Sequence, residues 1–78
     1  MEKITVTSSK IKAIAYDHSK EFLYVYFKNR NIYIHQNVPP NFWSECMLAD
    51  SIGRYYFDNI RHTFPYEIAQ ELKDQEEE

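Results

Sequence analysis

The residues best suited to binding chemistry lie in one short segment, Ser51-Ile52-Gly53-Arg54-Tyr55, which holds the only glycine of the chain. The segment follows a predicted helix, and glycine there lets the backbone turn with its N–H groups pointing outward. Such a nest binds phosphate, and Arg54 could add a two-pronged contact. The alternative is a helix C-cap, with Gly53 in the left-handed conformation and Arg54 solvated. The spacing does not match a P-loop, so nucleotide hydrolysis has no support.

A second candidate feature is a set of rings spaced two residues apart in two neighbouring predicted strands. Tyr24 and Tyr26 lie in the first strand, and Tyr33 and His35 lie in the next. On one open sheet face these rings would form a stacking platform for nucleic-acid bases. The alternative is that C-terminal segments cover the face and the rings are core, because a chain this short needs aromatic core.

Arg61 completes the candidate site. It could form a basic pair with Arg54 beside the rings, or it could tie the C-terminal segment to a carboxylate such as Asp58 or Asp17. We expect the ligand-facing side chains to converge near the glycine. The candidate ligand-binding residues are Tyr33, His35, Ser51, Gly53, Arg54, Tyr55 and Arg61.

Catalytic and metal chemistry find little support. Cys46 lies on the apolar side of a predicted helix, where a cysteine is usually a small buried hydrophobe. The three histidines have no metal-type spacing, and a single cysteine excludes paired-cysteine zinc sites. Asp50 and Asp58 are the only carboxylates near Gly53, and surface solvation explains both. We therefore expect a non-enzyme with no catalytic residues, no metal and no cofactor.

The elements that must position these residues begin with strands. Period-two alternation of apolar side chains predicts a short edge strand and three longer strands. They cover residues 3–7, 11–16, 21–28 and 32–36. In the third, we expect Leu23, Val25 and Phe27 to share the buried face. Polar turns at residues 17–20 and 29–31 join the longer strands.

Helices follow the strands. Pro39-Pro40 stops the sheet, because proline cannot donate to a strand ladder, and proline is well placed to open a helix. Helical spacing of apolar residues predicts three segments. They are a helix over residues 41–49, a short helical or irregular segment over 54–60, and a C-terminal helix over 66–73. We therefore expect an α+β fold, a small antiparallel sheet of three to four strands packed against one or two short helices.

Charge divides the chain unequally. The 78 residues carry a net charge of −3, but residues 1–66 hold eight basic and six acidic side chains, whereas residues 67–78 hold six acidic side chains and one lysine. The tail is either a solubilising end or a competitor for an anionic ligand on the basic body. The longest apolar run, Phe22–Phe27, is far shorter than the roughly 20 residues that span a membrane. We expect a cytoplasmic protein that does not bind membranes.

Several short motifs occur in an order that resembles the KTSC domain, which is named for its occurrence at the C-terminus of some lysyl-tRNA synthetases. The motifs are Ser8-Ser9-Lys10-Ile11, Tyr16-Asp17, Leu23–Phe27, Tyr33-Ile34-His35 before Val38-Pro39, Ser51–Tyr55 and Ile60-Arg61. The resemblance covers about residues 7–66. We therefore divide the chain into a KTSC-like domain over residues 1–66 and an acidic C-terminal helix or tail over 67–78.

The resemblance implies a bacterial or phage protein of a family proposed to bind RNA, with no accepted catalytic residues. This chain departs from the family pattern at three positions. Arg30 stands where the family usually has glycine in a hairpin turn, Ile52 replaces a lysine, and His35 replaces an aromatic residue. The missing lysine removes one cation from the expected anion site.

These observations favour a non-catalytic binding module for a phosphate-bearing ligand, with RNA as the default. Two alternatives stay open. One is a binder that sequesters a small signalling nucleotide, as a phage protein could. The other is a protein-interaction or homodimerisation module that uses an exposed aromatic face or the edge strand at residues 4–6. The sequence leaves open whether the protein is a monomer or a homodimer.

The acidic tail provides a first test. Deleting residues 74–78 should change the free energy of unfolding by no more than about 0.5 kcal/mol, because like charges at a chain end stabilise little. Urea titration of the full and shortened chains measures this difference. A much larger loss would indicate that the tail docks on the basic body.

Overall fold

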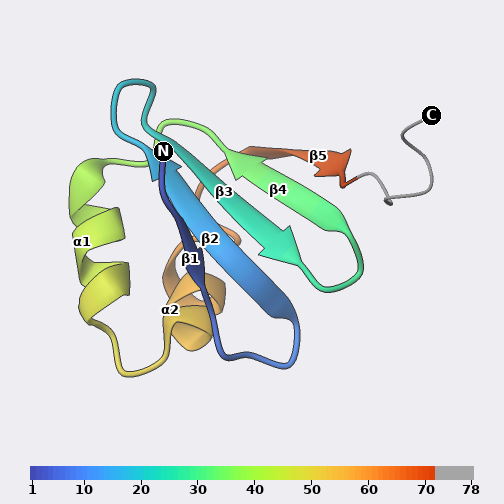
Figure 1. The fold of residues 1–78 in the computed structure, drawn as a ribbon. Helices are drawn as coiled ribbons and strands as arrows, with labels where there is room; N and C mark the ends of the chain where they lie inside the picture. The colour runs from blue at the N-terminus through green and yellow to red at the C-terminus, as the bar shows by residue number, and fades with distance from the viewer. Residues whose placement is uncertain (72–78) are drawn as a thin grey trace.

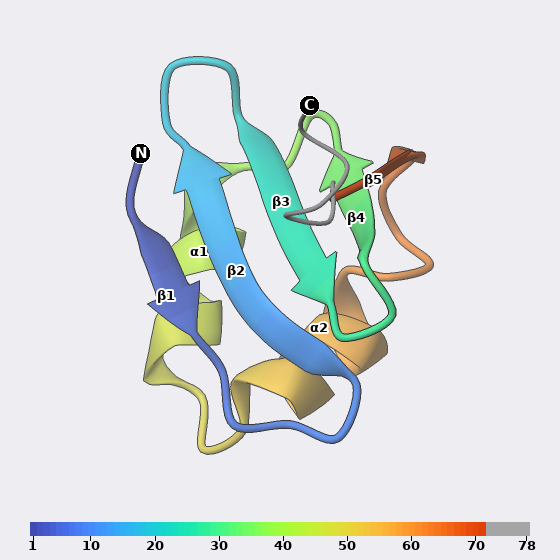
Figure 2. The same ribbon diagram turned by 45° about the vertical axis from the view of Figure 1, so that its right-hand side comes forward.

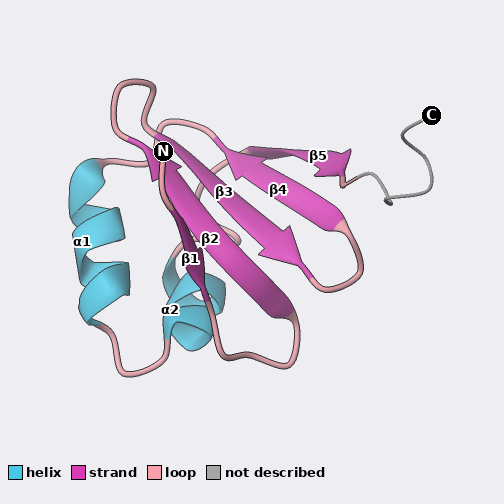
Figure 3. Cartoon of the chain, in the orientation of Figure 1, coloured by secondary structure: helices cyan, strands magenta, loops and turns pink. Residues whose placement is uncertain are grey.

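The computed structural model describes residues 1–71, which form a five-stranded antiparallel sheet with two helices on one side (Figure 1). The strands, in chain order, are β1 (Lys3–Thr5), β2 (Ile11–Asp17), β3 (Phe22–Phe27), β4 (Asn31–His35) and β5 (Tyr66–Gln70). The helices α1 (Pro40–Leu48) and α2 (Ile52–Asn59) lie between β4 and β5 in the chain. Figure 3 separates the two layers by colour. The predicted α+β class is confirmed, with one strand more than expected.

The strands lie in the sheet in the order in which they occur in the chain, so each strand pairs with the next. The helices lie behind the sheet in the view of Figure 2 and cover one of its faces. That face carries Leu23 and Val25 of β3, both fully buried, together with Ile14 of β2, which pairs with Val25. Alternation along β3 therefore places the residues predicted to be core in the core.

Two hairpin turns place a non-glycine residue in the left-handed region of backbone conformation. They are Glu21, with φ 58°, before β3, and Arg30, with φ 77°, before β4. In the β3–β4 turn the Arg30 N–H donates to the Phe27 carbonyl at 3.1 Å. This three-residue loop ends in a left-handed residue, a common hairpin geometry that usually employs glycine.

The helices begin where the sequence provides start signals. Pro40 opens α1, and Cys46 of α1 is fully buried, as predicted. Burial raises the pKa of the Cys46 thiol to about 11, so the thiol is protonated and unreactive at neutral pH. Ser51 is the N-cap of α2, and its hydroxyl accepts a hydrogen bond from the Arg54 N–H at 3.1 Å.

Gly53 differs from the expectation. It lies in the first turn of α2 and has no positive φ, so it forms neither a C-cap nor a backbone nest. A Cβ at this position would lie 3.3 Å from Ser8 Oγ, which in turn accepts hydrogen bonds from the Lys10 and Ile11 N–H groups. A side chain at this position would therefore be tightly packed, because α2 approaches the β1–β2 loop closely.

The C-terminal helix predicted over residues 66–73 is wrong for its first five residues, which form β5. Tyr33 of β4 pairs with Ile68, and His35 pairs with Tyr66. The outer edge of β4 would otherwise present unpaired backbone groups, and closing that edge outweighs the helical spacing of the apolar residues. Residues 72–78, with most of the predicted acidic tail, lie outside the described part of the chain.

Within residues 1–71, no helix is long and apolar enough to cross a membrane.

The left-handed residue at the β2–β3 turn gives a test of this backbone. Glu21→Gly should raise the free energy of unfolding by about 0.5–1 kcal/mol, because relief of left-handed strain exceeds the entropic cost of glycine. Chemical denaturation measures the change. Lys20→Gly, at the neighbouring exposed position without a positive φ, is the control and should be neutral or destabilising. A destabilised Glu21→Gly variant would contradict this account.

Candidate ligand-binding cleft

A cleft of about 490 Å³ opens where the β1–β2 loop, the β3–β4 turn and α2 meet. The β3–β4 turn contributes Lys28 and Asn29, and Tyr33 extends from β4 on the helix side of the sheet. Phe57 of α2 and Arg61, just after α2, close the other side. The remaining lining residues are Ser9, Lys10 and Phe27.

Three cations surround the cleft. The Lys10 ammonium lies 5.7 Å from the centre of the Phe57 ring, and the Arg61 guanidinium lies 5.0 Å from the ring of Tyr33 and 4.6 Å from that of Tyr66. Lys28 is exposed in the turn. No carboxylate lines the cleft, and the two ion pairs found within residues 1–71 lie elsewhere. The cleft is therefore a focus of positive charge on a chain that is acidic overall.

Aromatic rings form the apolar part of the cleft. The Phe27 ring centre lies 4.6 Å from that of Tyr33 and 6.3 Å from that of Phe57. Tyr33 stacks on Tyr66 with ring centres 4.6 Å apart and planes 7° from parallel. Tyr33 and Phe57 are both half-buried, and Phe57 is the ring that lies beside the Lys10 ammonium.

The uncharged polar groups also favour donation to a ligand. Asn29 Oδ1 accepts the Asn31 N–H at 3.0 Å, which leaves the Asn29 amide NH₂ as the group available to a ligand. Ser9 adds an exposed hydroxyl. Donors and cations without a carboxylate match a ligand rich in acceptor oxygens, such as a phosphate.

Two of the predicted site residues, Tyr33 and Arg61, lie in this cleft. The other predicted cation, Arg54, does not. Its guanidinium lies 3.8 Å from Asp58, one turn further along α2, and both side chains are largely exposed. The expected convergence of Arg54 and Arg61 near Gly53 is therefore wrong, because a second helix begins at Ile52 and holds Arg54 on an exposed face outside the cleft.

The remaining predicted residues have structural contacts. Ser51 caps α2, Gly53 packs against Ser8, and the Tyr55 hydroxyl donates to Glu45 of α1 at 2.9 Å. None of the three lines the cleft. Lys10 and Lys28 also line the cleft but were not assigned to the site. Lys10 belongs to the Ser8-Ser9-Lys10-Ile11 motif and Lys28 ends a predicted strand, and nothing in the sequence indicates that the two lie beside one cleft.

His35 is fully buried and forms two hydrogen bonds. Its Nδ1 lies 3.1 Å from the Phe64 carbonyl oxygen, which can only accept, so Nδ1 carries the proton. Nε2, 2.7 Å from the Tyr56 hydroxyl, then accepts from that hydroxyl. Burial lowers the pKa of His35, and the nearby Arg61 lowers it further, against the opposing effect of the Phe64 hydrogen bond. His35 thus joins β4 to α2 in the neutral form and does not face a ligand.

The predicted stacking platform is divided between two faces. Leu23 pairs with His35 and Val25 pairs with Tyr33, so His35 and Tyr33 face the helices. Tyr24 and Tyr26 pair with Ile34 and Ile32 on the opposite face. The four rings therefore do not form one open platform. For Tyr33 and His35 the alternative holds, because the helices cover their face.

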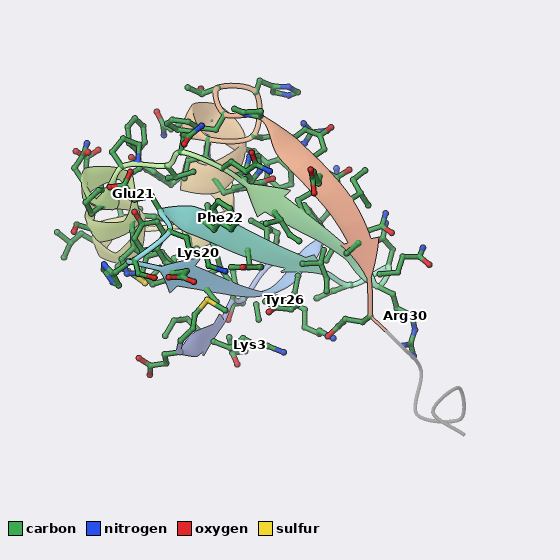
Figure 4. All side chains as sticks on the ribbon, turned by 90° about the horizontal axis from the view of Figure 1, so that it is seen from above. Lys3, Lys20, Glu21, Phe22, Tyr26 and Arg30 are labelled. Carbon is green, nitrogen blue, oxygen red and sulfur yellow. The ribbon has the colours of Figure 1, made fainter. Side chains whose placement is uncertain are left out.

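The face away from the helices carries a different aromatic row, Phe22, Tyr24 and Tyr26, all half-buried. The Lys3 ammonium lies 4.2 Å from the centre of the Tyr26 ring, and Figure 4 shows the two residues side by side. In the same view Phe22 and Lys20 lie at the opposite end of β3 from Arg30. These rings cover the small side chains of β2 opposite them, because Ala13 and Ala15 are buried and pair with Tyr26 and Tyr24.

An antiparallel sheet whose strands follow chain order, two helices on one face and a basic cleft at one end define a small α+β domain. The family model of the KTSC domain matches residues 7–64, so the chain belongs to the KTSC domain family. The family resemblance of the sequence is thereby confirmed, and β5 lies beyond the matched region.

Relatives in bacteria support the assignment. An uncharacterized protein of Stutzerimonas stutzeri is 30% identical over 56 residues, which cover 72% of this chain and 79% of the relative. A protein of Tsukamurella paurometabola is 34% identical over 59 residues, covering 76% and 88%. The crystal structure of a KTSC domain protein from Yersinia pestis superimposes with a TM-score of 0.76 at 27% identity, over 91% of this chain and 97% of that one.

The buried histidine gives a pH-dependent prediction. In the unfolded chain His35 becomes protonated below about pH 6.5, whereas the hydrogen bonds of the folded protein require the neutral ring. The contribution of His35 to the free energy of unfolding should therefore be complete above about pH 6.5. It should fall, by up to about 1.4 kcal/mol per pH unit, as the pH drops towards the lowered pKa.

Urea titrations between pH 7.5 and 5.5 measure this effect. His35→Gln should be less stable at neutral pH but should lose this part of the pH dependence. His62→Gln, at an exposed position, is the matched control and should retain it. A parent protein equally stable at both pH values would contradict the assignment of a neutral histidine.

Proposed function

We propose that the cleft binds a phosphate-bearing ligand without converting it, and that single-stranded RNA is its default ligand. The observation that carries the proposal is the composition of the lining: among residues 1–71 it has three cations, an amide NH₂ and a hydroxyl, with no carboxylate. Lysine and arginine side chains that surround a cleft attract phosphate and hold it by charge-assisted hydrogen bonds. The same lining would repel a cation, so the ligand is expected to be an anion.

Rings beside the cations support a nucleotide over a simple anion. Phe57 is half-buried and contacts Lys10 on one side, and Phe27 and Tyr33 extend the apolar surface. Proteins that bind single strands combine a basic surface with aromatic faces on which bases stack. In this arrangement Lys10, Lys28 and Arg61 hold phosphate, and the Phe57 ring holds a base.

A small free nucleotide is the second candidate, and the size of the cleft favours it. A volume of about 490 Å³ lies within the range of roughly 300–1,000 Å³ that is usual for small-molecule sites. The lining favours binding alone for either ligand, because no histidine or carboxylate of residues 1–71 lines the cleft to act as a base for the Ser9 hydroxyl.

One lysine variant inside the cleft and one arginine variant outside it test the proposal. Lys28→Ala should weaken binding of a fluorescent single-stranded RNA about tenfold and reduce the salt slope of log K by about 0.7, because one phosphate contact is lost. Arg54→Ala removes the same charge from an exposed site outside the cleft and should change affinity less than about twofold. Fluorescence anisotropy at two salt concentrations, with circular dichroism as a check of folding, measures both.

Equal weakening by the two variants would mean that binding is diffuse and not centred on the cleft. If the parent protein binds neither RNA nor nucleotides at low salt, the proposed function is wrong, and the protein-interaction hypothesis becomes the better one.

A further inference from the structure

We propose that the cleft takes a phosphomonoester, the terminal phosphate of a nucleotide or of an RNA end, in preference to an internal phosphodiester. This inference rests on the proposed function and specifies the ligand chemistry of the same site. It follows from three features: the number of cations, the space that they surround and the absence of any acidic neighbour in the lining.

The space limits how much ligand can enter. At about 490 Å³ the cleft has the volume of a site for one small molecule, so it accommodates about one nucleotide and not a run of several. All the phosphate charge that the cations meet inside the cleft must therefore come from one nucleotide and its immediate linkage. An internal nucleotide brings a phosphodiester with a single negative charge.

The charge of the lining exceeds what one phosphodiester can balance. Lys10, Lys28 and Arg61 supply three positive charges, and none of them is ion-paired within residues 1–71. A phosphomonoester carries about −1.5 to −2 at pH 7 and has three strong acceptor oxygens. It can therefore meet several of these donors at once, whereas a phosphodiester has only two non-bridging oxygens and half the charge.

The three cations come from three segments that the fold holds in place. Lys10 precedes β2, Lys28 follows β3, and the Lys28 N–H donates to the Lys10 carbonyl at 2.9 Å, which joins the two loops. Arg61 follows α2, where its N–H donates to the Tyr56 carbonyl at 2.9 Å and its guanidinium lies against Tyr33 and Tyr66. Three cations that line one cleft and stand on connected backbone favour one compact anion over an extended chain of phosphates.

Matched RNA oligonucleotides test the inference with the intact protein. One eight-nucleotide RNA is prepared with a 5′-phosphate, with a 3′-phosphate and with hydroxyl groups at both ends, and a nucleoside 5′-monophosphate is tested beside them. The preferred phosphorylated RNA should bind at least about tenfold more tightly than the hydroxyl form, as one additional charge-assisted contact would give. Phosphatase treatment should abolish the preference.

Two controls assign the preference to the cleft and to the phosphomonoester. Lys10→Ala and Lys28→Ala should each reduce the ratio of the two affinities, and Arg54→Ala should leave it unchanged. The ratio should also fall between pH 7.5 and 5.5, because the second ionisation of a phosphomonoester has a pKa of about 6. No histidine or carboxylate of residues 1–71 lines the cleft, so a fall in the ratio over this pH range reports the ionisation of the phosphate.

The outcomes separate this inference from the proposed function. Equal binding of phosphorylated and hydroxyl RNA overturns the phosphomonoester preference and leaves RNA binding intact. No binding of any RNA or nucleotide overturns both. If the nucleoside monophosphate binds as tightly as the phosphorylated RNA, the inference holds with the free nucleotide as ligand source, and much weaker binding of the monophosphate assigns the site to RNA ends.

Discussion

The register of the β3–β4 hairpin is the constraint on which the rest of this structure depends. The loop contains three residues and ends in left-handed Arg30, so Val25 lies opposite Tyr33 and Leu23 lies opposite His35. A two-residue loop would pair Tyr26 with Tyr33 and turn every side chain of β4 to the other face. A single backbone conformation in the turn therefore decides that Tyr33 and His35 lie beneath the helices.

The core and the cleft both follow from that register. His35, facing inward, accepts the hydroxyl of Tyr56 and donates to the Phe64 carbonyl, which ties α2 and the segment after it to β4. Arg61 lies between these two contacts in the chain, so it is held next to Tyr33. A buried polar bridge thus places an arginine at the mouth of the cleft, although the histidine itself never reaches it.

Most of the sheet could be predicted because period-two alternation and proline punctuation are local signals. The buried face of β3, the start of α1 and the burial of Cys46 all followed from them. The predictions that were wrong concern residues whose conformation depends on partners far away in the sequence. In the sequence Gly53 resembles a helix end, but in the structure it lies inside α2, where it packs against Ser8.

The same limitation applies to the site. Tyr33 and Arg61 were identified, but Lys10 and Lys28 belong to separate loops that only the closed sheet brings to one cleft. Residues 66–70 have a helix-like spacing of apolar side chains, and only the open edge of β4 makes them a strand. The sequence also left open which face the rings of β4 occupy, because this depends on the length of the β3–β4 loop, which the turn residues alone do not determine.

The position of β5 affects how the protein is made. The first four strands are joined by short local turns. β5 joins β4 only after residues 36–65, the segment that contains both helices. The sheet is therefore incomplete until synthesis has passed residue 70. During that interval the free edge of β4 is a template on which another nascent chain could add a strand, so crowded translation would favour misassembly until β5 emerges.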